Sequence, residues 1–167
     1  MAGPVWIRWL LTVAFLVAAG YYVRRLVTAG PEYLGRDRAT DVAHVVMSTG
    51  MAVMSSPIGG PLSPASWLTL FCLLGACAAV RWRGDTEAPH LALASVAMAY
   101  MLAAGTHDAR QMSGPWVVHT RGLALPEVAW ALAAYFAVYA VLTAKRPART
   151  PRLVLTLGMS YMLVMMA

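Results

Sequence analysis

The stretch VWIRWLLTVAFLVAAGYYV, residues 5–23, places the chain among integral membrane proteins. It holds a single charged residue, Arg8, and it has the length of a helix that crosses the hydrocarbon core, which takes roughly 20 apolar residues. The run continues directly into Arg24 and Arg25, and positive charge after an apolar run holds that end in the cytoplasm. We therefore interpret it as an uncleaved first span rather than a signal peptide.

Five further apolar stretches follow, separated by breaks that carry charge, glycine or proline. The 167 residues are 60% hydrophobic and only 12% charged, and the mean hydropathy of +0.62 lies far from that of soluble domains. Two cysteines are too few for a disulfide framework. The sequence predicts one all-α transmembrane domain of six helices, with spans at 5–23, 41–58, 65–82, 88–105, 126–143 and 151–167.

The basic residues divide unevenly between the predicted loops. Of thirteen Lys and Arg residues, ten fall in the first, third and fifth loops: Arg24, Arg25, Arg36, Arg38, Arg81, Arg83, Lys145, Arg146, Arg149 and Arg152. The positive-inside rule then places the odd loops in the cytoplasm and both termini outside a plasma membrane. The net charge of +6 is explained by this topology, so we expect a lipid bilayer as partner and no nucleic acid.

Methionine marks three of the six predicted spans. Apart from Met1 and Met112, every methionine lies in the second, fourth or sixth span, and each of these spans contains a unit of small-Met-small-x-Met. The unit reads GMAVM at 50–54, AMAYM at 97–101 and GMSYM at 158–162. In each span it lies roughly 12–15 Å from the cytoplasmic face, near the bilayer midplane. This repeat predicts three helical hairpins with the even-numbered helices inside.

The spacing of these methionines favours a soft metal. Residues three or four apart share a helix face, so each Met-x-x-Met presents two thioethers together. Thioether sulfur is uncharged and selects Cu(I) among the metals of the cell. The hypothesis is a copper transport or delivery protein whose ligands are Met51, Met54, Met98, Met101, Met159 and Met162. Met47 and His44 continue the path inward, and His107, Met112 and His119 offer capture ligands outside.

Other interpretations of these residues stay open. Methionine is also an adaptable core filler, and the alternative is a non-catalytic accessory subunit of a larger membrane complex, such as a respiratory one, or a homo-oligomer. Two imidazoles on neighbouring helices can ligate the iron of a haem b, and His44 and His90 are such a pair. We consider haem b the less favoured cofactor. The Ser, His and acidic residues form no catalytic constellation, so the sequence predicts no enzyme.

The stretch HVVMSTGMAVM, residues 44–54, followed by a hairpin and by His90 leading to MAYM at 98–101, carries a resemblance. The chain resembles a family of small actinobacterial polytopic membrane proteins of unassigned function, and the resemblance covers most of its length. It implies a membrane topology and an actinobacterial source. It brings no activity, so the metal hypothesis rests on residue chemistry.

Overall fold

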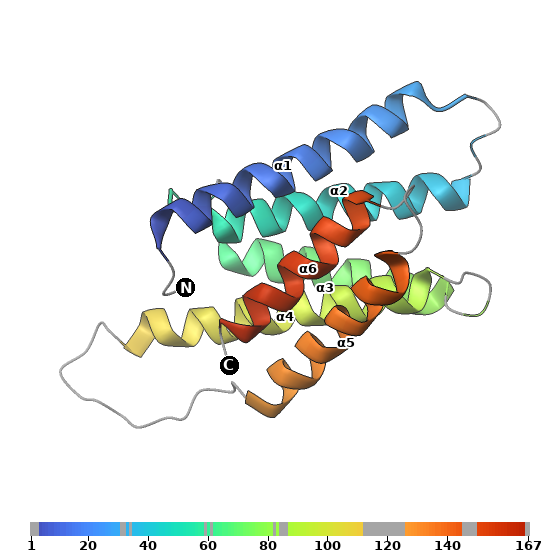
Figure 1. Ribbon diagram of the computed structural model, residues 1–167. Coiled ribbons are helices and arrows are strands. Elements are labelled where there is room, and N and C mark those ends of the chain that lie inside the picture. Colours follow the sequence, from blue (N-terminus) through green and yellow to red (C-terminus); the bar gives the residue numbers. More distant parts are fainter. Residues whose placement is uncertain are drawn as a thin grey trace. The chain divides into compact units, whose positions relative to one another are not determined.

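A computed structural model describes residues 4–30, 33, 35–58, 60, 62–81, 83, 87–111, 126–144 and 150–165, with the side chains of residues 36, 104–111 and 150 left aside. The described chain is all-helical and contains no strand (Figure 1). Its six helices are α1 (Val5–Thr28), α2 (Gly35–Ser55), α3 (Pro64–Arg81), α4 (Ala88–Gln111), α5 (Pro126–Ala144) and α6 (Thr150–Val164). Every predicted span therefore corresponds to a helix.

Three helices run further than the sequence predicts. α1 continues past residue 23 to Thr28, because arginine is a good helix former and its charge complements the C-terminal end of the helix dipole. α2 begins at Gly35 instead of residue 41, with Asp37 in its first turn, where a negative charge is favourable. α4 extends beyond residue 105 to Gln111 as a polar extension of an apolar helix.

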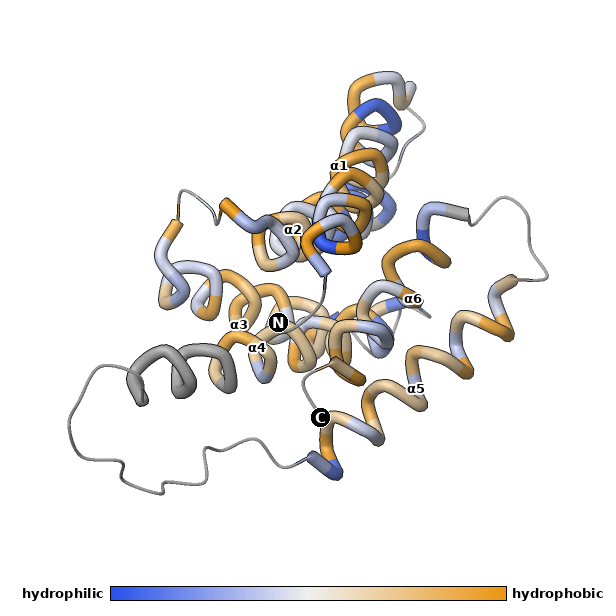
Figure 2. The backbone as a smooth tube through the Cα atoms, turned by 60° about the vertical axis from the view of Figure 1, so that its left-hand side comes forward, coloured by the Kyte–Doolittle hydropathy of each residue, from blue (hydrophilic) through white to orange (hydrophobic). Residues whose placement is uncertain are grey.

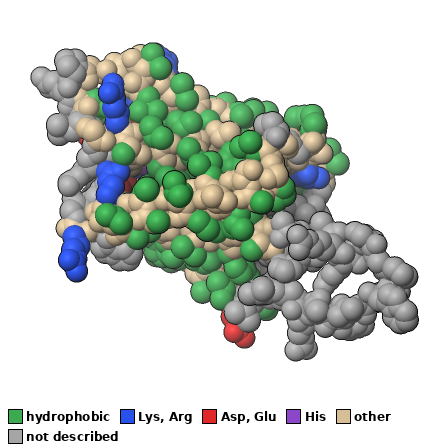
Figure 3. Space-filling model, turned by 180° about the vertical axis from the view of Figure 1, so that it is seen from behind, with side chains coloured by type: hydrophobic (Ala, Val, Ile, Leu, Met, Phe, Trp, Pro, Cys, Tyr) green, Lys and Arg blue, Asp and Glu red, His purple; other side chains and the backbone are tan. Residues whose placement is uncertain are grey.

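The odd-numbered helices are the ones most suited to lipid. α1, α3 and α5 are each long and apolar enough to cross a membrane, and α5 is apolar along nearly its whole length (Figure 2). The apolar parts of α4 and α6, residues 88–103 and 151–164, are shorter, and α2 carries charged residues in its first turns. Much of the side-chain surface visible in Figure 3 is hydrophobic, and basic side chains are few. The chain is thus a membrane protein in character.

The helices fall into two compact units, which are described separately. The first unit comprises α1, α2, α6 and α5 from Ala131 onward. In it α1 and α2 pack as an antiparallel hairpin, and α6 packs against α1 (Figure 1). Gly158 makes this possible, since a Cβ at that position would overlap the ring of Phe15, which is itself fully buried. Small residues allow such close helix approach in membranes.

The third expected hairpin differs from the other two. α6 packs more extensively on α1 than on α5. It contacts α5 through a hydrogen bond of 3.0 Å from the Ser160 hydroxyl to the carbonyl of Ala133. The Phe15 ring fits against Gly158, so α6 has a partner other than its neighbour in the sequence. A repeat in sequence has therefore not produced three equal hairpins.

The second unit contains α3, α4 and the first turn of α5. α3 and α4 form a hairpin, and they approach closely where Gly75 faces Ser95. A Cβ on Gly75 would lie 3.2 Å from that of Ser95, so the glycine sets the distance between the two helices. Trp67 and Phe71, one turn apart on α3, stack with ring centroids 5.8 Å apart and are both buried.

Candidate functional site

The predicted thioether ligands of the first unit lie on α2 and α6, and most are buried. Met51 and Met162 are 0% exposed, Met159 is 2% exposed and Met47 is 4% exposed, whereas Met54 is half-buried. The amphipathic spacing of α2 explains this, because residues 47, 51 and 54 follow each other at intervals of three and four along one side of the helix. The methionines therefore belong to the interior of the protein and not to its surface.

One polar contact links the two methionine-bearing helices of this unit. The Ser55 hydroxyl of α2 donates to the sulfur of Met162 on α6, with 3.9 Å between oxygen and sulfur. Ser55 lies one helical turn after Met51, so the two share a face of α2. The Met51 side of α2 and the Met162 side of α6 therefore approach each other near the end of α2.

The remaining predicted ligands lie elsewhere. Met98 and Met101, 0% and 3% exposed, belong to α4 in the second unit. Met112 and His119 lie outside the described residues, as does the side chain of His107. Among the residues that are described, no group of three or more His, Cys, Asp or Glu side chains gathers as a metal site.

His44 sits in a defined environment at the other end of α2. Its side chain is 4% exposed, and Nδ1 donates to the carbonyl of Thr40 at 2.7 Å. Its ring stacks on that of Tyr22 from α1, with centroids 4.7 Å apart and an interplanar angle of 19°. The imidazole is held by α1 as well as by its own helix, which fixes its orientation.

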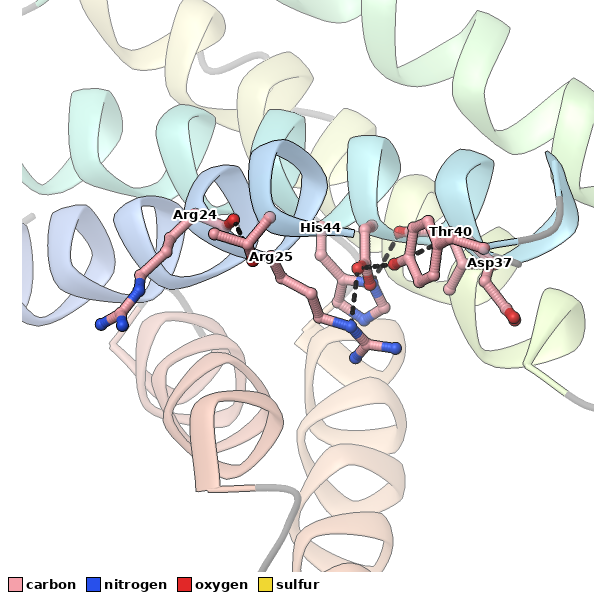
Figure 4. A network of polar contacts seen from close by, with 8 residues as sticks. Arg24, Arg25, Asp37, Thr40 and His44 are labelled. Atoms are coloured by element: carbon pink, nitrogen blue, oxygen red, sulfur yellow. Dashed lines mark hydrogen bonds and ion pairs between the residues drawn. The ribbon is translucent and has the colours of Figure 1, made fainter. Parts of the chain in front are cut away.

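A buried carboxylate, which the sequence interpretation used only to mark the start of a span, is the centre of a polar network (Figure 4). Asp41 is 1% exposed and pairs with Arg25 of α1, whose Nε lies 3.1 Å from Oδ2. The Tyr33 hydroxyl donates to the same carboxylate oxygen, and the Arg25 guanidinium lies 5.6 Å from the centroid of the Tyr33 ring. These contacts satisfy a charge that would otherwise be costly to bury.

The connection between α1 and α2 is held by this network. Tyr33 lies between the two helices, and its burial and its hydrogen bond to Asp41 raise the pKa of its hydroxyl to about 12. The negative charge of the carboxylate disfavours ionisation of the phenol beside it. Tyr33 is therefore a neutral donor to Asp41 throughout the physiological range.

The sequence contains a signal for this network. An aspartate in an otherwise apolar span needs a partner, and an arginine pair lies just before it on the neighbouring helix. The rotation of α1 decides whether Arg24 or Arg25 faces Asp41. In the structure it is Arg25 that forms the ion pair. Figure 4 shows Arg24 directed away from the network. The role of Tyr33 depends on the course of the connection, which periodicity does not reveal.

The opposite end of the α1–α2 hairpin is joined by a second arginine. Nε of Arg8 donates to the carbonyl of Ser55 at 3.2 Å, and Nη2 donates to that of Ser56 at 3.0 Å. These carbonyls end α2, where helices leave acceptors without partners and where the dipole is negative. Arg8, which in the sequence is only a charge near the start of the first span, thus caps the C-terminal end of α2.

Comparison with known proteins gives a family and no activity. No curated protein and no solved structure shows significant similarity to the chain. A family profile matches residues 36–166, which include α3 to α6 and nearly all of α2 and leave out α1. The match covers most of the sequence, and it agrees with the resemblance to a family of unassigned function. The chain belongs to the family described as Domain of unknown function (DUF5134).

Proposed function

We propose that this protein is a six-span plasma-membrane protein, with both termini outside and its odd loops cytoplasmic, that binds Cu(I) through buried thioethers as part of copper transport or delivery. The apolar character of α1, α3 and α5 supports a bilayer environment. The basic residues at the ends of α1 and α3 support this orientation.

The observation that carries the proposal is the burial of methionine on two helices that meet. Met51 and Met162 are both fully buried, and the sulfur of Met162 accepts a hydrogen bond from Ser55, one turn after Met51. A packing role requires only volume. The contact with Ser55 directs a thioether sulfur toward α2, the helix with most methionines, and this favours a ligand role.

The chemistry suits an uncharged site. Thioethers bind Cu(I) without losing a proton, so the protein avoids burying an anionic ligand in lipid. The Met51–Met162 pair forms the core of the proposed site, and Met47, Met54 and Met159 supply further sulfurs in the same unit. Met98 and Met101 are the corresponding thioether ligands that we propose on α4, in the second unit. His44 stands toward the end that we propose as cytoplasmic, as a release ligand.

The test is a Cu(I) titration of the full chain in detergent, with a chromogenic Cu(I) chelator as competitor. The variant Met51→Leu/Met162→Leu removes two thioethers while nearly conserving volume, so the fold is retained. We expect the wild-type protein to withdraw Cu(I) from the chelator and the double variant to lose at least tenfold in affinity, about 1.4 kcal/mol. Helical circular dichroism and the unfolding midpoint verify that both proteins are folded.

The matched control is Met165→Leu, because Met165 follows α6 and is 48% exposed. It changes the methionine count without touching the proposed site, and we expect wild-type affinity. Equal binding by all three proteins, or no binding by any, contradicts the proposal.

A second candidate is an accessory subunit of a membrane complex, and α5 provides the observation that favours it. Val138, Val141 and Leu142 are 58%, 67% and 68% exposed, and Tyr135 stacks on Tyr139 at 6.1 Å. Such a face suits a partner helix as well as it suits lipid. Copurification of a defined membrane protein that is lost on Val138→Lys supports this candidate, whereas retention of the partner contradicts it.

A further inference from the structure

Ser55, the last residue of α2, contacts two neighbouring helices of the first unit. Its carbonyl accepts a hydrogen bond of 3.2 Å from Nε of Arg8 on α1, and its hydroxyl donates to the sulfur of Met162 on α6 at 3.9 Å. Ser55 and Met162 are both fully buried. One buried residue therefore connects the Arg8 guanidinium with the Met51–Met162 pair, the core of the proposed copper site.

The positive charge of Arg8 lies close to that pair. Two contacts and one serine separate Nε of Arg8 from the sulfur of Met162, and the two oxygens of a serine are at most about 4.5 Å apart. The nitrogen and the sulfur therefore lie within about 12 Å of each other. Met51 precedes Ser55 by about 6 Å along the axis of α2. A metal ion held by the pair would lie within reach of the Arg8 field.

Backbone dipoles offset the charge of Arg8 only in part. Nη2 donates to the carbonyl of Ser56 at 3.0 Å, beside the contact of Nε with the carbonyl of Ser55. No carboxylate of the described residues forms an ion pair with Arg8. The C-terminal end of a helix carries about half a unit of negative charge, against the full positive charge of a guanidinium. This end of α2 is therefore positive overall.

The sign of this charge matters for a cation bound beside it. Carbonyl groups at a helix C-terminus are themselves cation ligands in membrane proteins, and here Arg8 occupies them. Without Arg8, the negative end of α2 would add to the attraction of the thioethers for a metal ion. With Arg8, a bound Cu(I) meets a second positive charge. At an effective dielectric constant of about 20, two unit charges about 12 Å apart repel by an energy that corresponds to about tenfold in affinity.

We propose that Arg8 is a fixed positive charge that weakens cation binding at the Met51–Met162 pair and so promotes release of the metal. This inference rests on the proposed function, because it concerns the affinity of the same thioether site. Transport or delivery requires a site that binds its ion and also lets it leave. Arg8 is not a ligand. It acts on the bound ion through its charge, and its two hydrogen bonds to the end of α2 hold that charge in place.

The experiment compares Cu(I) affinity and Cu(I) release, both measured with a chromogenic Cu(I) chelator, in the full chain and its Arg8 variants in detergent. Arg8→Gln keeps a hydrogen-bond donor and removes the charge, and we expect about tenfold tighter binding and slower release to excess chelator. Arg8→Lys keeps the charge, so its affinity stays within about threefold of the wild type. The matched control Arg24→Gln removes the same charge from an exposed position about 24 Å away along α1 and leaves the affinity within about twofold.

The direction of the effect separates this role from a structural one, because damage to the site lowers the affinity whereas removal of a repulsive charge raises it. Arg8→Leu, a neutral variant suited to an apolar span, replaces Arg8→Gln if the latter does not fold. Unchanged or weaker binding by the folded neutral variant, equally tight binding by Arg8→Lys, or an equal gain in Arg24→Gln overturns this proposal alone, provided that the wild type binds Cu(I) through Met51 and Met162. Absence of Cu(I) binding by the wild type overturns the proposed function and this inference together.

Discussion

The two ends of the α1–α2 hairpin are each closed by an arginine of α1, but the arginines bind different acceptors. At one end Arg25 pairs with the buried carboxylate of Asp41, and Tyr33 donates to the same group. At the other end Arg8 donates to two backbone carbonyls, those of Ser55 and Ser56. One contact joins two full charges, and the other joins a charge to a helix terminus.

The difference lies in what each contact requires of the rest of the structure. The carbonyls at the end of α2 exist in any helix, and the dipole gives them a partial negative charge. The Asp41 carboxylate is desolvated by the fold, so its stability depends on its partners. The Arg8 end is thus built from backbone, whereas the Arg25 end is a network of side chains in which every member matters.

The largest effect is expected from Asp41→Asn. It removes the negative charge that Arg25 and Tyr33 share, and loss of hydrogen bonds to a charged group costs about 2 kcal/mol. Partial exposure of Arg25 limits the loss, because its guanidinium regains water. The measurement is the free energy of unfolding in mixed micelles titrated with a denaturing detergent. Asp37→Asn, at an exposed position in the first turn, is the control, and an equal loss in both variants contradicts the buried network.

A smaller loss is expected from Arg8→Ala. The carbonyls of Ser55 and Ser56 lose a charged donor, but helix ends accept water in its place, so the cost is about 1 kcal/mol. The same unfolding titration measures it, with the exposed Arg24→Ala as a matched arginine deletion. If Arg8→Ala is as harmful as Asp41→Asn, the two ends do not differ in the way described.

The Arg25 end is also expected to respond to alkaline pH, unlike the Arg8 end. The folded chain holds the Tyr33 proton more tightly than the unfolded chain, since the pKa rises from 10.0 to about 12. The stability that Tyr33 contributes is therefore complete below pH 10 and is lost as the pH rises through 12. The measurement is a titration of tyrosinate absorbance in the wild type and in Tyr33→Phe. The difference between the two curves reports the Tyr33 phenol alone, and we expect it to ionise at about pH 12. Ionisation near pH 10 contradicts the hydrogen bond to Asp41.

The smallest effect is expected at Ser55, whose backbone matters more than its hydroxyl. Ser55→Ala keeps the carbonyl that Arg8 binds and removes only the donor to the Met162 sulfur, a weak acceptor. The expected loss is a few tenths of a kcal/mol in the free energy of unfolding. A double-mutant cycle with Met162→Leu isolates the contact, and a coupling above about 1 kcal/mol shows that the hydroxyl has a structural role of its own.

Hydropathy predicted the fold to the level of individual helices. All six expected spans correspond to helices, because a helix satisfies the backbone hydrogen bonds of an apolar run internally. The ends were less predictable: α1 reaches Thr28 and α2 begins at Gly35, since charged residues continue a helix into the interface. The partner of α6 was missed, because the fit of Gly158 on Phe15 depends on helix rotation.

The candidate sites were likewise predictable from the sequence only in part. Burial of Met51, Met98 and Met162 follows from residue type and spacing, and the structure agrees. Whether their sulfurs bind a metal remains a prediction, because packing and coordination select the same residues. The network around Asp41 combines α1, α2 and the connection between them, so no single periodic pattern encodes it.

The two arginines of α1 have a consequence for the membrane around the hairpin. Arg8 and Arg25 are about 25 Å apart along the helix axis, and each is tied to a partner at its own end of α2. Neither side chain is free to snorkel outward when the surrounding lipid thickens. Hydrophobic mismatch must then be relieved by tilt in a thinner bilayer or by local thinning of a thicker one, and not by sliding of one helix along the other. The fixed spacing of the two arginines thus matches the α1–α2 hairpin to a narrow range of bilayer thickness.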